Sequence, residues 1–249
     1  MTPKKKKGQV IAVCIQEPFE DGSSMDFGAI QGADLKYLHQ AFITDTIINA
    51  LKVEDTDIRL YYIGSSERNK LVKIVTEYVK KKAPEKISSE IKRRLKLSEM
   101  SKERWGIRIE KLFEDCFSCG YERVLVIGSR SPTVSRQKIE TAMQLLKKAD
   151  AVFGPTPDGR YYVIGMSKSY HIKLSEFDWK SPSIYNEVAR ALEDKGLEWS
   201  ELEIWYAVET PDYLEVMVRD INQFRIEGDE STAHETELVM ERLLGKLEN

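Results

Sequence analysis

The sequence predicts an α/β fold in which a mostly parallel, mixed sheet carries helices on both faces. Short runs rich in β-branched residues alternate with longer helical patterns along the chain, as expected of strands joined by helical crossovers. Some runs are apolar at every position, as in Val124-Leu125-Val126-Ile127, which is typical of strands buried on both faces. The length of 249 residues fits one large domain, since a domain takes roughly 100–200 residues.

The predicted elements follow one another as strands and helices with few interruptions. Strands are predicted at residues 10–15, 58–64, 123–129, 151–154, 161–166 and 203–208. Helices are predicted at residues 34–51, 67–82, 103–119, 134–148, 183–195, 211–220 and 233–247. Residues 80–104 are dense in Lys, Arg and Glu and are broken by Pro84, so we expect a charged helical insertion there. The domain itself is predicted to cover residues 9–249.

Charge limits the classes of partner. Lys and Arg total 38 against 41 Asp and Glu, a formal net charge of −3, so no overall basic field attracts nucleic acid. Residues 1–8 are expected to be a disordered basic tail, and a second basic cluster lies at residues 92–94. Nucleic-acid contact through these clusters is an alternative, but solvated lysines and a solvated helix face are favoured because acids are interleaved. No segment approaches the roughly 20 apolar residues of a membrane-spanning helix.

The cysteines indicate a reducing compartment. The chain has three, Cys14, Cys116 and Cys119, an odd and low number that argues against a disulfide framework. We therefore predict a cytoplasmic protein. Cys116 and Cys119 have the spacing of a redox or metal pair, but they end a helical pattern, and no four-ligand zinc set accompanies them. Two buried helix cysteines are the favoured interpretation.

The loops that follow the strands are the candidate site, because ligands of open α/β sheets bind beyond the carboxyl ends of the strands. Residues 16–24 form a Gly/Ser-rich loop that is suited to wrap a nucleotide or to be an ordinary surface loop. The third strand is followed by Gly128-Ser129-Arg130-Ser131-Pro132. Its small residues allow a ligand near the backbone, and its arginine can hold a phosphate with two parallel hydrogen bonds. A solvated loop arginine is the alternative.

Two later loops add charged and aromatic side chains. Asp158-Gly159-Arg160 leads into a strand that starts with Tyr161, so it is either a tight turn or a frame for a flat, anionic ligand. Glu209 follows the last predicted strand. It is a candidate base or metal ligand, or an acid that interacts with the positive end of the helix beginning at Pro211.

Motifs in these loops resemble a known family. Gly128-Ser129-x-Ser131-Pro132, Gly154-Pro155-x-x-Asp158-Gly159-x-Tyr161-Tyr162 and Trp179-x-Ser181 occur in the family's order, as do Gly106 and Arg108. They are similar to an uncharacterised bacterial and archaeal family, described as glycosyltransferases, of the glycosyltransferase A (nucleotide-diphospho-sugar transferase) superfamily. That family is related to the guanylyltransferases of molybdenum-cofactor and deazaflavin-coenzyme synthesis. The resemblance covers about residues 10–217 and is most specific over residues 120–192.

The resemblance implies a Rossmann-like fold and a transferase that binds a nucleotide or nucleotide-sugar. It also implies which residues bind the ligand. These are Arg108, Gly128, Ser129, Arg130, Gly154, Pro155, Gly159, Arg160, Tyr161, Trp179 and Ser181, of which Arg130 and Arg160 stand where the family has other residues. Asp158 and Glu209 are expected to be the catalytic pair.

The chain departs from the family where the family holds a metal. The acid expected between Ser129 and Ser131 is Arg130, and the first of two late acids is Ala207. An arginine in place of an acid changes the local charge by about two units, the opposite of what a Mg²⁺ site needs. We therefore predict a degenerate metal site, which disfavours Mg²⁺ or Mn²⁺ without excluding them.

Two interpretations follow, and the fold alone does not decide between them. In the first, Arg108, Arg130 and Arg160 hold phosphates in place of a metal, and Asp158 and Glu209 orient the acceptor or act as base in glycosyl or nucleotidyl transfer. In the second, the protein is a non-catalytic relative that serves as a binding or scaffold protein. A salt bridge between Arg130 and Glu209 would favour an inert site, and an open cleft with Arg130 beside Asp158 would favour metal-free binding of an anion.

Overall fold

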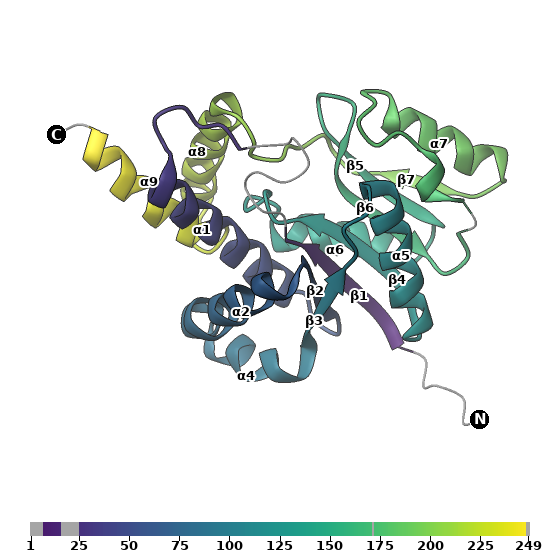
Figure 1. Ribbon diagram of the computed structural model, residues 1–249, viewed down its shortest axis with the longest axis horizontal. Coiled ribbons are helices and arrows are strands. Elements are labelled where there is room, and N and C mark those ends of the chain that lie inside the picture. The colour runs from purple at the N-terminus through teal and green to yellow at the C-terminus, as the bar shows by residue number, and fades with distance from the viewer. Residues whose placement is uncertain (1–6, 16–24, 171, 248–249) are drawn as a thin grey trace.

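The computed structural model describes residues 7–15, 25–170 and 172–247 (Figure 1). Most of the predicted basic tail and the whole Gly/Ser-rich loop at 16–24 lie outside these residues. Lys7 and Gly8, which were assigned to the tail, belong to the first strand, β1 (Lys7–Cys14).

The described strands form one mixed sheet in the order β3-β2-β1-β4-β6-β5-β7. β6 is antiparallel to both of its neighbours, β4 and β5, and every other pairing is parallel. The predicted fold class is therefore confirmed. After β1 the strands are β2 (Asp57–Ile63), β3 (Leu95–Met100), β4 (Tyr121–Gly128), β5 (Ala151–Pro155), β6 (Tyr161–Ser167) and β7 (Trp199–Glu201).

Helices cover both faces of this sheet (Figure 1). On one face α1 (Gly32–Leu51), α2 (Ser65–Lys73), α4 (Glu85–Arg94) and α6 (Arg136–Leu145) pack on the strands. On the other face α5 (Trp105–Ser118) and α7 (Ile184–Asp194) form a second core with the strands. Shorter helical segments are the π-helix η2 (Ile74–Val79), α3 (Lys80–Lys82) and the 3₁₀ helix η3 (Leu174–Glu176). None of the described helices is long and apolar enough to span a membrane.

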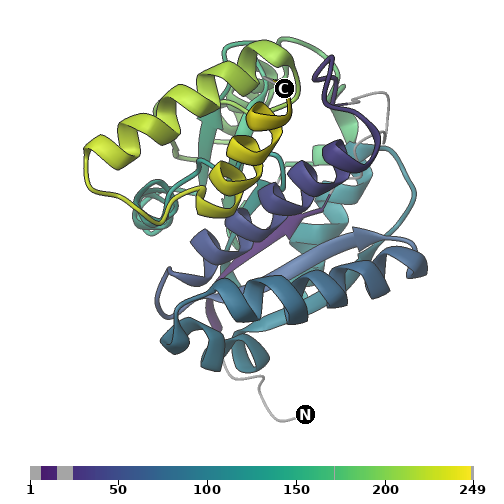
Figure 2. The same cartoon turned by 90° about the vertical axis from the view of Figure 1, so that its left-hand side faces the viewer.

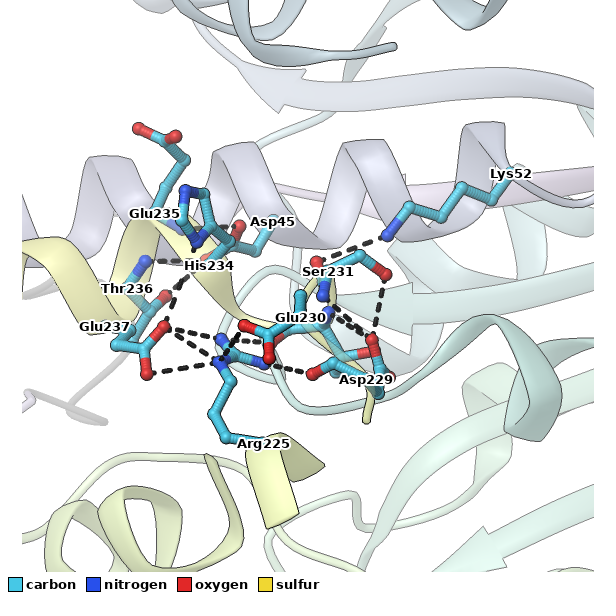
Figure 3. A network of polar contacts seen from close by, with 11 residues as sticks. Asp45, Lys52, Arg225, Asp229, Glu230, Ser231, His234, Glu235, Thr236 and Glu237 are labelled. Carbon is cyan, nitrogen blue, oxygen red and sulfur yellow. Dashed lines mark hydrogen bonds and ion pairs between the residues drawn. The ribbon is translucent and has the colours of Figure 1, made fainter. Parts of the chain in front are cut away.

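A third core lies outside the sheet layers, where α8 (Pro211–Ile226) and α9 (His234–Leu247) pack on the first half of α1 (Figure 2). Because α1 is covered by the sheet on one side and by these helices on the other, it is buried over most of its circumference. The start of α9 is held by the buried carboxylate of Asp45 on α1, which accepts hydrogen bonds from the backbone of Glu235 and Thr236 (Figure 3).

Residues 95–100 and 203–208 differ from the predictions. Residues 95–100 form the edge strand β3, which pairs with β2, within the stretch expected to be helical. The predicted strand at 203–208 is irregular, and β7 precedes it. The Leu202 amide donates to the Phe153 carbonyl, and the Trp205 amide donates to the Pro155 carbonyl. The chain therefore advances three residues, from 202 to 205, while β5 advances two, from 153 to 155. This mismatch ends the ladder.

The basic cluster at 92–94 is not a uniform solvated face. Arg94 is buried and donates to the backbone carbonyls of Leu51, Val53 and Thr56 at 2.5 to 2.8 Å. Its guanidinium therefore holds the turn between α1 and β2, and it is not available to a nucleic-acid backbone.

Candidate functional site

A cavity of about 600 Å³ lies beyond the carboxyl ends of β1 and β4, where Cys14 and Gly128 contribute to its wall. This is the edge at which open α/β sheets bind ligands, and the volume is in the usual range for small-molecule sites. Eight of the predicted site residues line it, namely Arg108, Gly128, Arg130, Asp158, Arg160, Tyr161, Trp179 and Glu209.

A chain of charges runs along one side of the cavity. Arg130 Nη1 donates to Glu209 Oε1 at 3.0 Å, and Arg160 Nη2 lies 3.3 Å from Glu209 Oε2. Arg160 also pairs with Asp158 Oδ2 at 2.6 Å. Burial opposes the charge of Asp158, but hydrogen bonds from Thr156 and Arg160 hold the pKa of this carboxyl below its usual value. Both candidate catalytic carboxylates are therefore paired with arginines.

Arg130 is the most deeply buried member of this chain, with 1% of its side chain exposed, whereas Arg160 is 44% exposed. The solvated-loop interpretation of Arg130 is therefore wrong. The salt bridge that we expected of an inert site is present, and so is a cavity lined by Arg130 and Asp158 together. The salt bridge and the cavity, which the sequence presents as alternatives, therefore occur together.

Backbone hydrogen bonds bring the members of the chain together from distant parts of the sequence. The Ser129 amide donates to the Cys14 carbonyl, which joins the loop after β4 to the end of β1. The Val208 amide donates to the Arg130 carbonyl at 2.7 Å and places Glu209 opposite the guanidinium. The irregular course of residues 203–208 allows this contact, because the chain leaves β5 and crosses to the loop after β4.

The loop that carries Asp158 is a tight turn, as one of the two interpretations predicted. The Gly159 amide donates to the Thr156 carbonyl, and Gly159 has a φ of +80°. A Cβ at this position would lie 1.8 Å from the Pro182 carbonyl oxygen, so only glycine fits. The turn also directs Arg160 and Asp158 to the cavity, so the two interpretations of this loop are compatible.

Aromatic side chains form another wall. Tyr161 and Trp179 meet edge to face at 5.3 Å between ring centroids, and Trp105 Nε1 donates to the Tyr161 hydroxyl. The guanidinium of Arg108 lies over the Trp105 ring, 5.2 Å from its centroid. A Cβ on Gly106 would lie 2.6 Å from Trp179 Nε1, so this glycine lets α5 and Trp179 approach closely.

Five predicted ligand-binding residues do not line the cavity but support its walls or neighbouring loops. Gly154 accommodates the Tyr162 ring, which would lie 2.5 Å from a Cβ there. Pro155 accepts a hydrogen bond from Trp205, and Ser181 contacts Ser183 and Glu187. Ser129 is fully buried, and Gly159 shapes the turn.

Several residues that line the cavity were not among the sequence predictions. Trp105 was the most accessible to prediction, because it lies one helical turn before Arg108 and therefore shares a helix face with it. The others include Arg104, Thr156, Phe177, Asp178, Lys180 and Tyr213. They come from loops and helix starts whose direction no periodic pattern reveals.

Comparisons with known proteins agree with this fold. A family model described as "Uncharacterized protein conserved in bacteria (DUF2064)" matches residues 63–181. A protein from Desulfovibrio desulfuricans G20, described as a nucleotide-diphospho-sugar transferase, superposes with a TM-score of 0.71 at 19% identity, over 96% of this chain and 98% of that one. The protein has the fold of the nucleotide-diphospho-sugar transferases. No curated protein matched the sequence.

Two weaker structural matches have TM-scores below 0.5 and add nothing to the fold assignment. The 4-diphosphocytidyl-2C-methyl-D-erythritol synthase from Anaerococcus prevotii matches at 0.49 and 16% identity, over 86% of this chain and 94% of that one. A cytidylyltransferase from Leptospira borgpetersenii matches at 0.48 and 9% identity, over 96% and 95%. The expected relation to guanylyltransferases stays a prediction.

The residues of the cavity do not fit the divalent metal that proteins of this fold are expected to hold. Among the described residues no three of His, Cys, Asp and Glu gather as metal ligands. The two carboxylates that remain are joined through Arg160, and Arg130 occupies an oxygen of Glu209. An arginine side chain therefore already supplies the positive charge at both Asp158 and Glu209.

Proposed function

We propose that the cavity binds a nucleotide or nucleotide-sugar without a divalent metal, and that the bound molecule takes part in a transfer reaction. The observation that carries the proposal is the chain Arg130–Glu209–Arg160 along a cavity of about 600 Å³ at the carboxyl edge of the sheet. Oriented guanidinium groups can stabilise phosphate charge as a metal does.

The charge of the cavity wall supports an anionic ligand. Five cationic side chains and four carboxylates of the described residues line it, which leaves one excess positive charge. The exposed Arg160 is the member best able to exchange a carboxylate for a phosphate, because it is the most solvated of the paired groups. The rings of Trp105, Tyr161 and Trp179 supply flat surfaces suited to a base or sugar.

The pairing of both carboxylates favours one kind of transfer. An ion-paired Asp158, whose pKa lies below its usual value, is a weak base. A phosphate acceptor is largely ionised near pH 7, since its second pKa is about 6, and needs no base. We therefore favour nucleotidyl transfer to a phosphate over glycosyl transfer to a hydroxyl, with Asp158 and Glu209 orienting the arginines.

The second candidate function is binding without catalysis. It is favoured because both carboxylate oxygens of Glu209 already interact with an arginine, so Glu209 has little capacity left to act in catalysis. The two candidates differ in one outcome, because only the first predicts release of diphosphate when a nucleoside triphosphate and a sugar phosphate are both supplied.

Isothermal titration calorimetry with nucleotides and nucleotide-sugars tests the binding step, once with EDTA and once with Mn²⁺. We expect at least one ligand to bind with equal affinity in both conditions. Arg160→Gln should weaken it by about ten- to a hundredfold, the usual loss of a hydrogen bond to a charged group. Arg136→Gln is the matched control, because Arg136 is similarly exposed at 48% and lies outside the cavity. Absence of binding to every ligand would contradict the proposal.

The substitution Arg130→Asp tests whether this arginine replaces a metal. The variant places a new carboxylate beside Glu209, so Mn²⁺ should raise its melting temperature, whereas the wild type should not respond. Equal responses of the two proteins would show that Arg130 does not stand in for a cation.

A further inference from the structure

The two cysteines of α5 lie at the opposite end of this helix from the cavity. α5 contributes Trp105 and Arg108 to the cavity, and Cys116 and Cys119 lie at its last turn and C-cap. A helix of 14 residues is about 21 Å long, so this cluster is independent of the ligand site. Cys116 is buried and Cys119 is partly exposed, and neither forms a disulfide.

The guanidinium of Arg59 on β2 lies beside both thiols. Arg59 Nη1 donates to Cys119 Sγ at 3.3 Å, and Arg59 Nη2 pairs with Asp115 Oδ2 at 3.0 Å. Ser98 on β3 accepts from Nε and Nη2 at 3.2 and 2.9 Å. The guanidinium is therefore held from two strands and the helix, with one N–H directed at the Cys119 sulfur. A cationic donor next to the sulfur is typical of reactive cysteines, since the thiolate is the nucleophile.

Tyr61 connects the buried thiol to a solvated carboxylate. Its hydroxyl donates to Asp115 Oδ2 at 2.8 Å and lies 3.2 Å from Cys116 Sγ. A hydroxyl has one proton to donate, so the Cys116 thiol donates to the tyrosine oxygen. Burial raises the pKa of Cys116 to about 11, and the contacts of Tyr61 connect this thiol to Asp115, which is 43% exposed.

We propose that Cys119 and Cys116 are a peroxide-reactive dithiol that closes to an intramolecular disulfide. The Cys119 thiolate attacks one oxygen of a hydroperoxide, the O–O bond breaks, and the other oxygen leaves as alcohol or water after taking up a proton. The sulfur, oxidised by two electrons, is then a sulfenic acid. The Cys116 sulfur attacks it, the S–O bond breaks, and hydroxide leaves as water with the proton that Cys116 releases through Tyr61.

The helix end accommodates the bond. Side chains three residues apart on a helix have Cβ atoms about 5–6 Å apart, and a disulfide needs about 3.5–4.5 Å. Cys119 is the C-cap of α5 and is followed by Gly120, whose φ is +95°. The backbone that must move by roughly 1–2 Å therefore lies outside the regular helix.

Cys14 is the internal control for reactivity. It is fully buried, and burial raises its pKa to about 12. We expect it to stay reduced while the other two cysteines are oxidised.

The test treats the full-length protein with hydrogen peroxide and follows intact mass and peptide maps. The wild type should lose two hydrogen atoms and show a Cys116–Cys119 cross-link that dithiothreitol reverses. Cys116→Ser should accumulate a single dimedone adduct at Cys119, Cys119→Ser none, and Cys14→Ser should behave as the wild type. A cross-link that includes Cys14, or equal dimedone labelling of Cys119→Ser, would overturn the proposal.

Two further variants separate the roles of Arg59 and Tyr61 from a merely structural effect. In the Cys116→Ser background, Arg59→Gln should slow dimedone labelling after peroxide by roughly tenfold, because a charge-assisted hydrogen bond to the sulfur is lost. Tyr61→Phe should leave that labelling rate unchanged and slow disulfide closure by at least about tenfold. Closure at the wild-type rate in Tyr61→Phe would overturn the relay, and an unchanged labelling rate in Arg59→Gln would overturn the role of the guanidinium.

Discussion

Two clusters of this protein each contain carboxylates, and the clusters differ in the groups that those carboxylates bind. In the cavity cluster, formed by Arg130, Glu209, Arg160 and Asp158, each carboxylate is bound by at least one guanidinium. In the cap cluster at the start of α9, Asp45 accepts hydrogen bonds from the Glu235 and Thr236 amides and from the Thr236 hydroxyl (Figure 3).

The difference separates a structural cluster from a cluster that can bind a ligand. Asp45 satisfies the free amide donors of a helix start, and its side chain is buried. Arg225, in the same region, binds the Asp229 and Thr232 carbonyls in addition to Glu237. The cavity cluster instead pairs side chains that line a cavity, so we expect a phosphate to exchange with a carboxylate there.

The largest expected effect comes from Arg130→Met, which removes the buried half of the cavity cluster. Breaking a buried pair by removing one partner costs about 3–5 kcal/mol, so the free energy of unfolding should fall by about that amount in urea titrations. A loss below about 1 kcal/mol would show that Arg130 is not an essential partner of Glu209. It would also contradict the contrast drawn between the cavity cluster and the cap cluster. Arg136→Met, an exposed pair on α6, is the control.

The second effect concerns pH. Burial, and to a smaller extent the charge of Glu235, raises the pKa of Asp45 from 3.8 to about 7 against the hydrogen bonds that it accepts. Between these values the folded protein keeps a proton that the unfolded chain has lost, so stability should fall as pH rises from 4 to 7. The change is on the order of 4 kcal/mol at most. Asp45→Asn should flatten this part of the urea-derived stability profile, and a profile parallel to the wild type would contradict the assignment.

A third effect is the loss of the helix cap. Asp45→Ala leaves the Glu235 and Thr236 amides without their acceptor, at a cost of about 2 kcal/mol. The loss should be concentrated in α9, where hydrogen exchange of the first-turn amides should accelerate more than that of β4. Ligand affinity should not change, and a loss of binding would show that the two clusters are coupled.

The smallest effect on stability is expected for Arg160→Met. Because Arg160 and Asp158 are both about 40% exposed, their pair should contribute less than about 1 kcal/mol. The same variant should lose most of its nucleotide affinity in calorimetry. A large loss of stability with unchanged affinity would place Arg160 in the structural class with Asp45.

Sequence patterns predicted most elements because their signals are local. The run Val124-Leu125-Val126-Ile127 is fully buried in β4 as expected, and α5 and α7 begin and end within two residues of the predicted bounds. Residues 95–100 were missed because an edge strand depends on its partner β2, which no local pattern reveals. Residues 203–208 have strand-like composition, but their ladder with β5 is broken by a mismatch in register.

From residue identity and short spacings, the sequence by itself predicted a mostly parallel sheet whose loops at the carboxyl edge carry Arg130, Asp158 and Glu209. The missing acid of a metal site is an expectation from the family resemblance. Only the tertiary structure decided that Arg130 is buried against Glu209, 79 residues away in sequence, and that Arg59 lies between Cys119 and Asp115. Such contacts depend on strand order and on where irregular segments cross, because burial and pairing of charges arise only when distant segments pack together.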